Sequence, residues 1–222
     1  MKIALWHNNK DIRLEDVPRP VPGPGEMLVK VHACGICGSD VVEWYRMPRA
    51  PLVQGHELGL EVVEAGAGVV RFKPGDRVFI PPKIPCGECA LCRTGHFPQC
   101  SEVKERLPGG FAEHILVPRM FVENGTYRLP ESLSYEESTF IEPLACVVRA
   151  RRLSEADAAS NVLILGCGMS GLLHVQLAKK AGSRVVATDI QERKLEAARR
   201  HGADLAVPAG DDVPARTTEF FG

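Results

Sequence analysis

The sequence predicts a β-rich domain followed by part of an α/β domain. Up to about residue 130, short apolar runs are separated by Gly and Pro, a pattern typical of an all-β barrel or sandwich. After Ser160 the pattern becomes strand, glycine turn, helix, strand, helix, strand. That order predicts half of a doubly wound parallel sheet. We therefore expect two domains, at residues 1–152 and 153–222.

Composition narrows the range of partners. The chain has 222 residues, of which 45% are apolar and 25% charged, as in ordinary soluble globular proteins. A formal net charge of -1 attracts neither nucleic acid nor anionic lipid, and there is no run of ~18 apolar residues. The N-terminus MKIALWHNNK does not resemble a signal peptide. We expect a cytoplasmic protein without nucleic-acid or membrane partners.

The β-rich part contains four clear apolar runs. MLVKVHACGI, LGLEVVEAGAG, VVRFKPGDRVFI and GGFAEHILVP each read as a strand bounded by turn residues, and KPGD at 73–76 is itself a turn. The segment 131–152 instead has the pattern of a helix. Ser132 or Ser134 can cap a helix there, with acidic residues early and arginines late, which is the charge order that a helix dipole favours.

The α/β part begins with the strand VLIL. Gly182 and Gly202 follow the two helical stretches, where C-terminal caps are expected. A third strand candidate lies near Val207, and the tail AGDDVPARTTEFFG shows no clear period. A complete dinucleotide-binding domain has about six parallel strands. We therefore expect a C-terminally shortened product or a fragment.

Four cysteines lie close together in the run CGECALCRTGHFPQC: Cys86, Cys89, Cys92 and Cys100. Four thiolates complete a tetrahedral zinc site and leave no open position, so a structural zinc lobe is predicted at residues 86–100. One alternative is a pair of disulfides, which a cytosolic compartment disfavours. Another is a thiol redox sensor, in which the thiols would react without zinc removal.

Two further motifs offer metal ligands, Cys37 in CGSD and His56 in GHE. Taken singly, each is more often an ordinary core or surface residue. A catalytic zinc takes three protein ligands and keeps one open position. Glu142 in FIEPLAC is the best third donor and Cys146 the second choice, although Glu142 could simply be a first-turn helix carboxylate.

A glycine turn follows the strand VLIL. Gly166, Gly168 and Gly171 form GxGxxG between a strand and a helix, the context in which the motif binds a dinucleotide pyrophosphate. Asp189 ends the next strand, where a carboxylate can accept hydrogen bonds from a ribose diol and would repel a 2′-phosphate. NAD is therefore favoured over NADP. Lys194 either flanks the adenosine ribose or is a solvated helix lysine.

The chain resembles the zinc-dependent medium-chain dehydrogenases, particularly the sorbitol (polyol) and threonine dehydrogenase branch. The resemblance rests on CGICGSD, GHELGLEVVEAG, FKPGDRV, the four-cysteine lobe, GGFAEH, IEPLACVV and the glycine turn, in that order. It implies a chaperonin-10-like β-barrel catalytic domain and a partial Rossmann domain. It also implies hydride transfer between a secondary alcohol or polyol and NAD, and a homodimer or homotetramer. The alternative is an inactive paralogue that only binds zinc and nucleotide.

The resemblance also assigns residues. Cys37, His56 and Glu142 correspond to ligands of a catalytic zinc, and Glu57 to a carboxylate that can exchange onto the metal. Asp40 would orient His56. The remaining implied residues are Ser39 as proton relay, Met169 and Ser170 as cofactor contacts, and the lobe cysteines as structural zinc ligands.

One relay residue of the family is missing. Many relatives have a histidine where this chain has Val42, so the relay beyond Ser39 differs here. Glu43 is a hypothetical substitute. The particular alcohol is not predicted.

Overall fold

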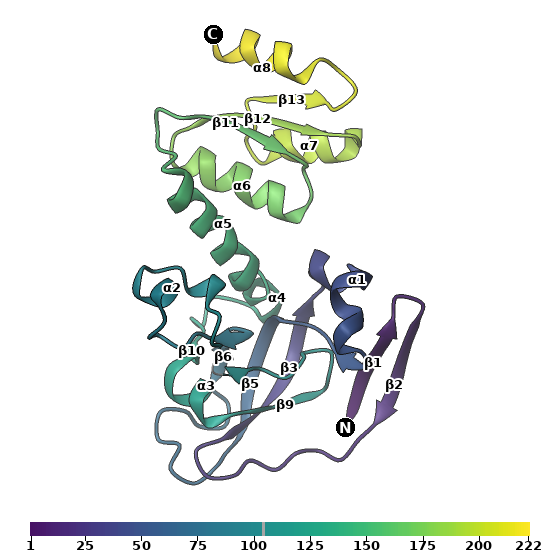
Figure 1. The fold of residues 1–222 in the computed structure, drawn as a ribbon, viewed down its shortest axis with the longest axis vertical. Coiled ribbons are helices and arrows are strands. Elements are labelled where there is room, and N and C mark those ends of the chain that lie inside the picture. The colour runs from purple at the N-terminus through teal and green to yellow at the C-terminus, as the bar shows by residue number, and fades with distance from the viewer. Residues whose placement is uncertain (104) are drawn as a thin grey trace. The chain divides into compact units, whose positions relative to one another are not determined.

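The computed structural model describes residues 1–103 and 105–222. It divides into two compact units, Met1–Glu142 and Pro143–Gly222 (Figure 1). Helix α5 (Ile141–Ser154) begins in the first unit and continues into the second. The expected domain boundary after residue 152 lies near the end of this helix and stays a prediction.

The first unit is built from antiparallel strands. These are β1 (Lys2–Asn8), β2 (Asp11–Asp16), β3 (Met27–Gly35), β4 (Leu52–Val53), β5 (Glu57–Ala65), β6 (Arg77–Phe79), β7 (Lys83–Ile84), β8 (Glu105–Arg106), β9 (His114–Val117) and β10 (Tyr127–Arg128). The larger sheet has the order β10-β6-β5-β3-β9 and the smaller the order β2-β1-β4, while β7 and β8 form a separate two-stranded ribbon. The predicted β-rich architecture is therefore present.

The core of the first unit lies on the larger sheet. Val29 on β3 is paired with Val62 on β5, and both are fully buried together with Leu58 and Leu60. The predicted KPGD turn precedes β6, with Gly75 at φ +91°. Such a positive φ favours glycine because other residues meet a steric penalty there.

Short helices connect these strands. They are η1 (Gly38–Asp40), α1 (Glu43–Arg46), η2 (Met47–Arg49), α2 (Ala90–Arg93), η3 (Phe97–Gln99), α3 (Arg119–Asn124) and α4 (Tyr135–Ser138). Ser134 caps α4 as predicted, since its side chain accepts a hydrogen bond from the Glu137 amide over 3.0 Å. Gly59 allows α4 to pack directly on β5, because a Cβ there would lie 2.3 Å from the Tyr135 carbonyl oxygen.

The second unit is a three-stranded parallel sheet with helices. Its further elements are β11 (Asn161–Leu165), α6 (Met169–Lys180), β12 (Arg184–Asp189), α7 (Glu192–Arg200), β13 (Leu205–Pro208) and α8 (Val213–Phe221). The strand order is β11-β12-β13, with α6 below the sheet and α8 above it in Figure 1. Gly182 and Gly202 follow α6 and α7 with φ of +90° and +102°, as expected of residues that end helices.

Helix α8 corrects the expectation of an aperiodic tail. The Asp212 side chain accepts a hydrogen bond from the Ala215 amide over 3.0 Å, and Pro214 lies in the first turn. Both residues favour a helix start. The local signal was therefore present, although the tail has no apolar period.

The second unit has its own apolar core. Val185 and Ala187 of β12 are fully buried against Val175 of α6 and Leu195 of α7. In the described part of the chain, no helix is both long and apolar enough to cross a membrane.

Candidate metal and dinucleotide sites

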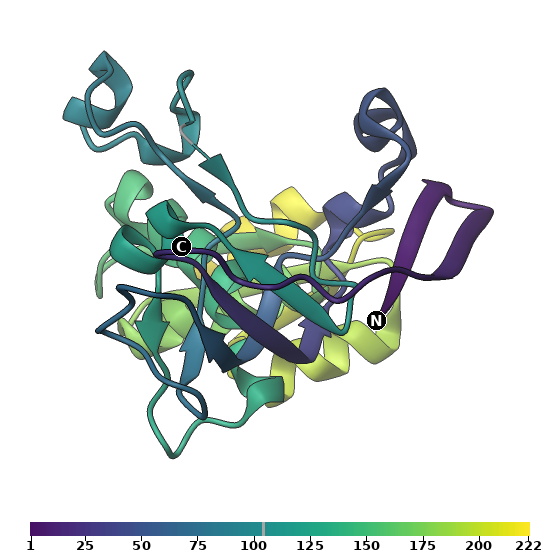
Figure 2. The ribbon, with the colours of Figure 1, turned by 90° about the horizontal axis from the view of Figure 1, so that it is seen from below.

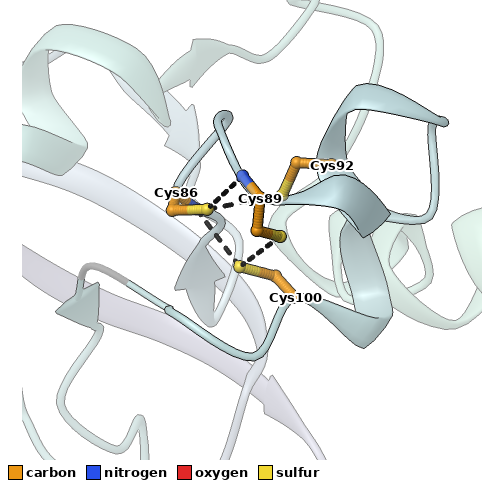
Figure 3. A group of neighbouring side chains, drawn as sticks. All are labelled: Cys86, Cys89, Cys92 and Cys100. Carbon is orange, nitrogen blue, oxygen red and sulfur yellow. Dashed lines mark hydrogen bonds between the residues drawn. The ribbon is translucent and has the colours of Figure 1, made fainter.

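The four lobe cysteines meet at one point. Their Sγ atoms all lie within 4.8 Å of one another (Figure 3). Cys86 follows β7, and Cys100 follows η3. Cys89 immediately precedes α2, and Cys92 lies within it. Figure 2 shows this lobe projecting from the sheets of the first unit. All eight cysteines lie among the described residues, and each of them is free rather than disulfide-bonded.

Backbone amides surround these sulfur atoms. The amides of Cys89 and Glu88 donate to Cys86 Sγ over 3.3 and 3.4 Å, and the Cys86 amide donates to Cys100 Sγ over 3.3 Å. The two bonds to Cys86 lower the pKa of its thiol to about 7. Burial instead raises the pKa of Cys92 to about 12. Four clustered sulfur donors with amide hydrogen bonds fit a structural zinc ion.

A second possible metal site lies elsewhere in the first unit. Ligand atoms of Cys37, His56 and Glu57 lie within 4.8 Å of one another. Cys37 precedes η1, and its sulfur accepts a hydrogen bond from the Ser39 amide over 3.5 Å. Glu57 is the first residue of β5, and His56 immediately precedes it. Residues far apart in sequence therefore contribute sulfur, nitrogen and oxygen donors to one group.

Glu57 carries the clearest sign of an unmet interaction. Glu57 is only 4% exposed, and its Oε1 atom has no hydrogen-bond partner among the described residues. Burial raises the pKa of Glu57, and the nearby Glu142 carboxylate raises it further, although His56 opposes this shift. An unpaired buried carboxylate oxygen is costly. A cation beside Cys37 and His56 would satisfy it, so this donor set also fits zinc.

Asp40 lies behind this group. It accepts hydrogen bonds from the Cys37 amide over 3.1 Å and from Arg46 over 2.8 Å. Asp40 Oδ1 lies 3.6 Å from His56 Nδ1, which is longer than a hydrogen bond. The expected orienting of His56 by Asp40 therefore stays a prediction.

Arg46 has a role that the sequence did not reveal. Its Nε donates to the Ser39 carbonyl over 2.9 Å and its Nη2 donates to Ser39 Oγ over 2.8 Å. Its side chain is only 11% exposed. The sequence offered no signal for these contacts beyond the presence of an arginine six residues after CGSD.

A cavity of about 410 Å³ adjoins the second metal group. Ser39, His56 and Glu142 line it, together with Tyr45 and Arg46. Glu142 thus shares the cavity with His56 but is outside the group of three ligand atoms. Its predicted role as third ligand stays a prediction.

Two alternatives considered from sequence lie elsewhere. Cys146, the second choice as third ligand, is exposed on α5. Glu43 accepts a hydrogen bond from the Asn9 amide over 3.0 Å and is not among the described residues that line the cavity. Its hypothetical relay role stays a prediction.

The glycine turn of the second unit has the expected geometry. Gly166 has φ +94°, and its amide donates to the Thr188 carbonyl over 2.8 Å. A Cβ at Gly171 would lie 1.8 Å from the Gly166 carbonyl oxygen, so only glycine permits this packing. Gly168 precedes α6 and faces open space. Met169 and Ser170 form the first turn of α6, whose amides can face a phosphate.

Asp189 stands at the end of β12, but it is more enclosed than expected. Its oxygens accept hydrogen bonds from the amides of Cys167 and Gln191 over 2.8 and 2.9 Å, and Lys194 Nζ lies 3.8 Å away. The bond from Cys167 is the main cause that lowers the pKa of Asp189. Each carboxylate oxygen has a second lone pair. Asp189 can therefore hold the glycine turn and still accept a ribose hydroxyl.

A cavity of about 490 Å³ lies beside this carboxylate. Asp189 and Lys194 line it together with Gly166. The open space at Gly168 and this cavity together fit a dinucleotide across the turn.

Two protein-family models match the chain. The alcohol dehydrogenase GroES-like domain matches residues 23–128, and the zinc-binding dehydrogenase domain matches residues 171–222. The expected order of a GroES-like (chaperonin-10-like) domain and a dinucleotide-binding domain is thereby confirmed.

Similar proteins span both regions. Sorbitol dehydrogenase of Bacillus subtilis is 36% identical over 91% of this chain and 60% of its own length. (R,R)-butanediol dehydrogenase of the same organism is 35% identical over 100% of this chain and 68% of its own. A zinc-binding dehydrogenase of Sinorhizobium meliloti, solved with NADP, has a TM-score of 0.83 and 38% identity over 96% of this chain and 63% of its own. The chain thus spans about 60% of the length of the first of these relatives.

Proposed function

Because the chain belongs to the zinc-dependent medium-chain alcohol dehydrogenase family, sorbitol dehydrogenase-like, we propose that it transfers hydride between a secondary alcohol or polyol and NAD. The carrying observation is the Cys37, His56 and Glu57 group beside a cavity, separate from the sulfur-only group. A mixed donor set at a cavity suits a catalytic zinc, whereas four cysteines suit a structural one. No observation favours the inactive alternative.

The ligands proposed for the catalytic zinc are Cys37 and His56, with Glu142 as the third protein ligand and Glu57 as the carboxylate that exchanges with it. Glu142 lines the cavity with His56, and Glu57 has an unpaired buried oxygen. Bound zinc would act as a Lewis acid toward a substrate oxygen. Cys86, Cys89, Cys92 and Cys100 would hold the structural zinc.

Ser39 is proposed to exchange the alcohol proton. Its hydroxyl lines the cavity and accepts a hydrogen bond from Arg46, so its own proton remains free to be donated. Arg46 stays cationic and cannot carry the proton further. In place of the relay histidine missing at Val42, Arg46 would stabilise negative charge on Ser39.

We propose NAD as the preferred cofactor. Asp189 keeps its charge near the site of the adenosine ribose, where a 2′-phosphate would meet repulsion. Lys194 partly offsets that charge and could flank the ribose. Measurement of the dissociation constants for NAD and NADP tests this preference, and Asp189→Asn should narrow the difference between them.

The decisive experiment measures NADH formation with a panel of secondary alcohols and polyols. Zinc-loaded protein should turn over at least one of them, and Cys37→Ser should reduce kcat/KM by at least about 100-fold, since one ligand of the metal is lost. Glu142→Gln should cause a comparable loss, and Cys146→Ser should not. A fully zinc-loaded protein that oxidises no alcohol would contradict the proposal.

A cytoplasmic location and a homodimeric or homotetrameric state are part of the proposal. Free cysteines in two metal-type groups suit a reducing compartment. Cell fractionation and analytical ultracentrifugation would test these two points.

A further inference from the structure

The cavity beside Cys37 and His56 is lined by an excess of cationic side chains. Arg46, Arg49, Lys83 and Arg106 contribute to its wall, whereas Glu142 is the one acidic residue among the described residues that line it. A neutral polyol needs no such excess. Charged groups that converge on one cavity are typical of sites that recognise an oppositely charged ligand.

The excess of positive charge remains after the ion pairs within the site are counted. Arg46 is paired with the buried Asp40 at 2.8 Å. A zinc ion held by one thiolate and one carboxylate would be formally neutral, so the second carboxylate of the pair Glu57 and Glu142 leaves one negative charge against the three remaining cations. Arg49, Lys83 and Arg106 thus leave the described lining with an excess of positive charge.

Two of these cations face each other across the β7–β8 ribbon. Lys83 and Arg106 are direct cross-strand partners in the antiparallel register. Like charges placed directly opposite each other destabilise a strand pair. Lys83 Nζ donates to the Pro98 carbonyl over 2.8 Å, which does not neutralise either charge. An anion held in the cavity would convert this repulsion into attraction.

A buried donor in the same wall has no partner. Gln54 is 6% exposed, and its Nε2 has no hydrogen-bond partner among the described residues. An unpaired buried N–H donor is costly unless a ligand or water accepts from it. A polyhydroxy anion offers such acceptors.

From these observations we propose that the substrate is an anionic polyol derivative, with a terminal phosphate or carboxylate bound by Arg49, Lys83 and Arg106. The inference rests on the proposed function, because the alcohol end of the same molecule would face Cys37 and His56. Arginine is suited to this role, since its planar fork binds carboxylate or phosphate through two hydrogen bonds.

The kinetic test compares D-sorbitol, D-sorbitol 6-phosphate and D-gluconate as substrates of the zinc-loaded protein. We expect kcat/KM for one of the two anions to exceed that for sorbitol by at least tenfold, and the better anion identifies the terminal group. Arg106→Gln and Arg49→Gln should each lower that value about tenfold and narrow the difference in kcat/KM between the anion and sorbitol. Arg13→Gln is the matched control, because Arg13 is an exposed arginine of β2, paired with Asp11.

A binding measurement tests the anion site independently of alcohol oxidation. Isothermal titration of zinc-loaded protein should show that the preferred anion binds at least tenfold more tightly than sorbitol, and Arg106→Gln should abolish the difference. Equal affinities for all three compounds would overturn the anionic substrate, even if alcohols were oxidised. Selective anion binding without turnover would instead contradict the dehydrogenase proposal and leave the anion site standing.

Discussion

At the scale of single residues, Arg46 shows how one side chain organises a site. It bonds to both the carbonyl and the hydroxyl of Ser39 and pairs with Asp40, whose side chain is only 3% exposed. The CGSD motif identified Ser39 and Asp40, but nothing local to the sequence showed that Arg46 would turn back onto them. That contact depends on the path of the chain through η1 and α1.

Replacing Arg46 should therefore destabilise the protein. Arg46→Met would leave the Asp40 carboxylate buried without its cation, a loss expected to cost about 3 kcal/mol of unfolding free energy. Arg46→Lys should recover part of this stability, because it restores a cation beside Asp40. It would not restore the two bonds to Ser39, so its kcat should remain below that of the wild-type protein. Urea denaturation of zinc-loaded protein would measure the first effect.

The matched control is Arg13→Met. The Arg13–Asp11 pair is exposed, so its loss should cost less than about 1 kcal/mol. Equal losses for the two variants would show that the Arg46–Asp40 pair has no special importance.

Asp204 provides a test of pH dependence. Burial alone would raise the pKa of this carboxyl, but hydrogen bonds from Lys179 and the Val185 amide outweigh it, so the net pKa is lowered. A lowered folded-state pKa adds stability above the unfolded value of about 3.9, and this stability is lost as pH falls through the folded value.

The wild-type protein should thus exceed Asp204→Asn in stability by about 1–2 kcal/mol at neutral pH, since a charged hydrogen-bond acceptor is lost. The difference should shrink once pH falls below about 4 and vanish below the folded pKa. Chemical denaturation of both proteins at several pH values would show this. A constant difference at every pH would contradict the assignment.

At the scale of elements, the glycines of the β11–α6 turn have two different roles: one permits close packing, and another leaves room for a ligand. Gly171 meets the Gly166 carbonyl, whereas Gly168 faces open space. The GxGxxG spacing predicted both roles, because each depends on neighbours within the same few residues. Helix α8 was missed for a different reason: its start depends on the Asp212 cap, not on an apolar period.

Alanine substitutions should distinguish the two glycines. Gly171→Ala forces the turn to move and should lower the unfolding free energy by about 1–3 kcal/mol, the usual cost of overpacking. Gly168→Ala should cost much less stability but weaken NAD binding, because its methyl group would occupy the approach to the phosphates. Thermal denaturation and NAD titration measure the two effects.

Gly210→Ala serves as the control for both variants. A Cβ at Gly210 meets no atom within 4 Å, so neither stability nor binding should fall. A Gly171→Ala protein as stable as the Gly210→Ala protein would refute the packing role.

At the scale of the whole molecule, the two compact units have separate apolar cores. Both metal groups lie in Met1–Glu142, and the glycine turn lies in Pro143–Gly222. Zinc and dinucleotide should therefore stabilise different cores, because a ligand stabilises the unit that binds it.

Calorimetry can test this separation. Chelation of zinc should lower the transition of the first unit, and ADP-ribose should raise that of the second, by amounts that grow with ligand concentration. Metal analysis should find two zinc ions per chain before chelation. One cooperative transition that responds equally to both treatments would contradict the separation.

By itself, the sequence determined the chemistry that depends on nearby residues. The spacing of Cys86, Cys89, Cys92 and Cys100 predicted one sulfur cluster, and Gly166 to Gly171 predicted the dinucleotide turn. In both cases a few residues of local backbone bring the groups together, so spacing alone is informative.

Only the tertiary structure decided which distant residues meet. The resemblance had assigned Cys37, His56 and Glu57 to one metal, and the fold brings their ligand atoms within 4.8 Å of one another. The fold also pairs Lys83 with Arg106 across β7 and β8. Such contacts depend on strand register, which is set by burial summed over the whole sheet and not by the residues that finally touch. For that reason the sequence indicated a zinc dehydrogenase, whereas the charge of the cavity, and with it the proposed substrate class, emerged only from the fold.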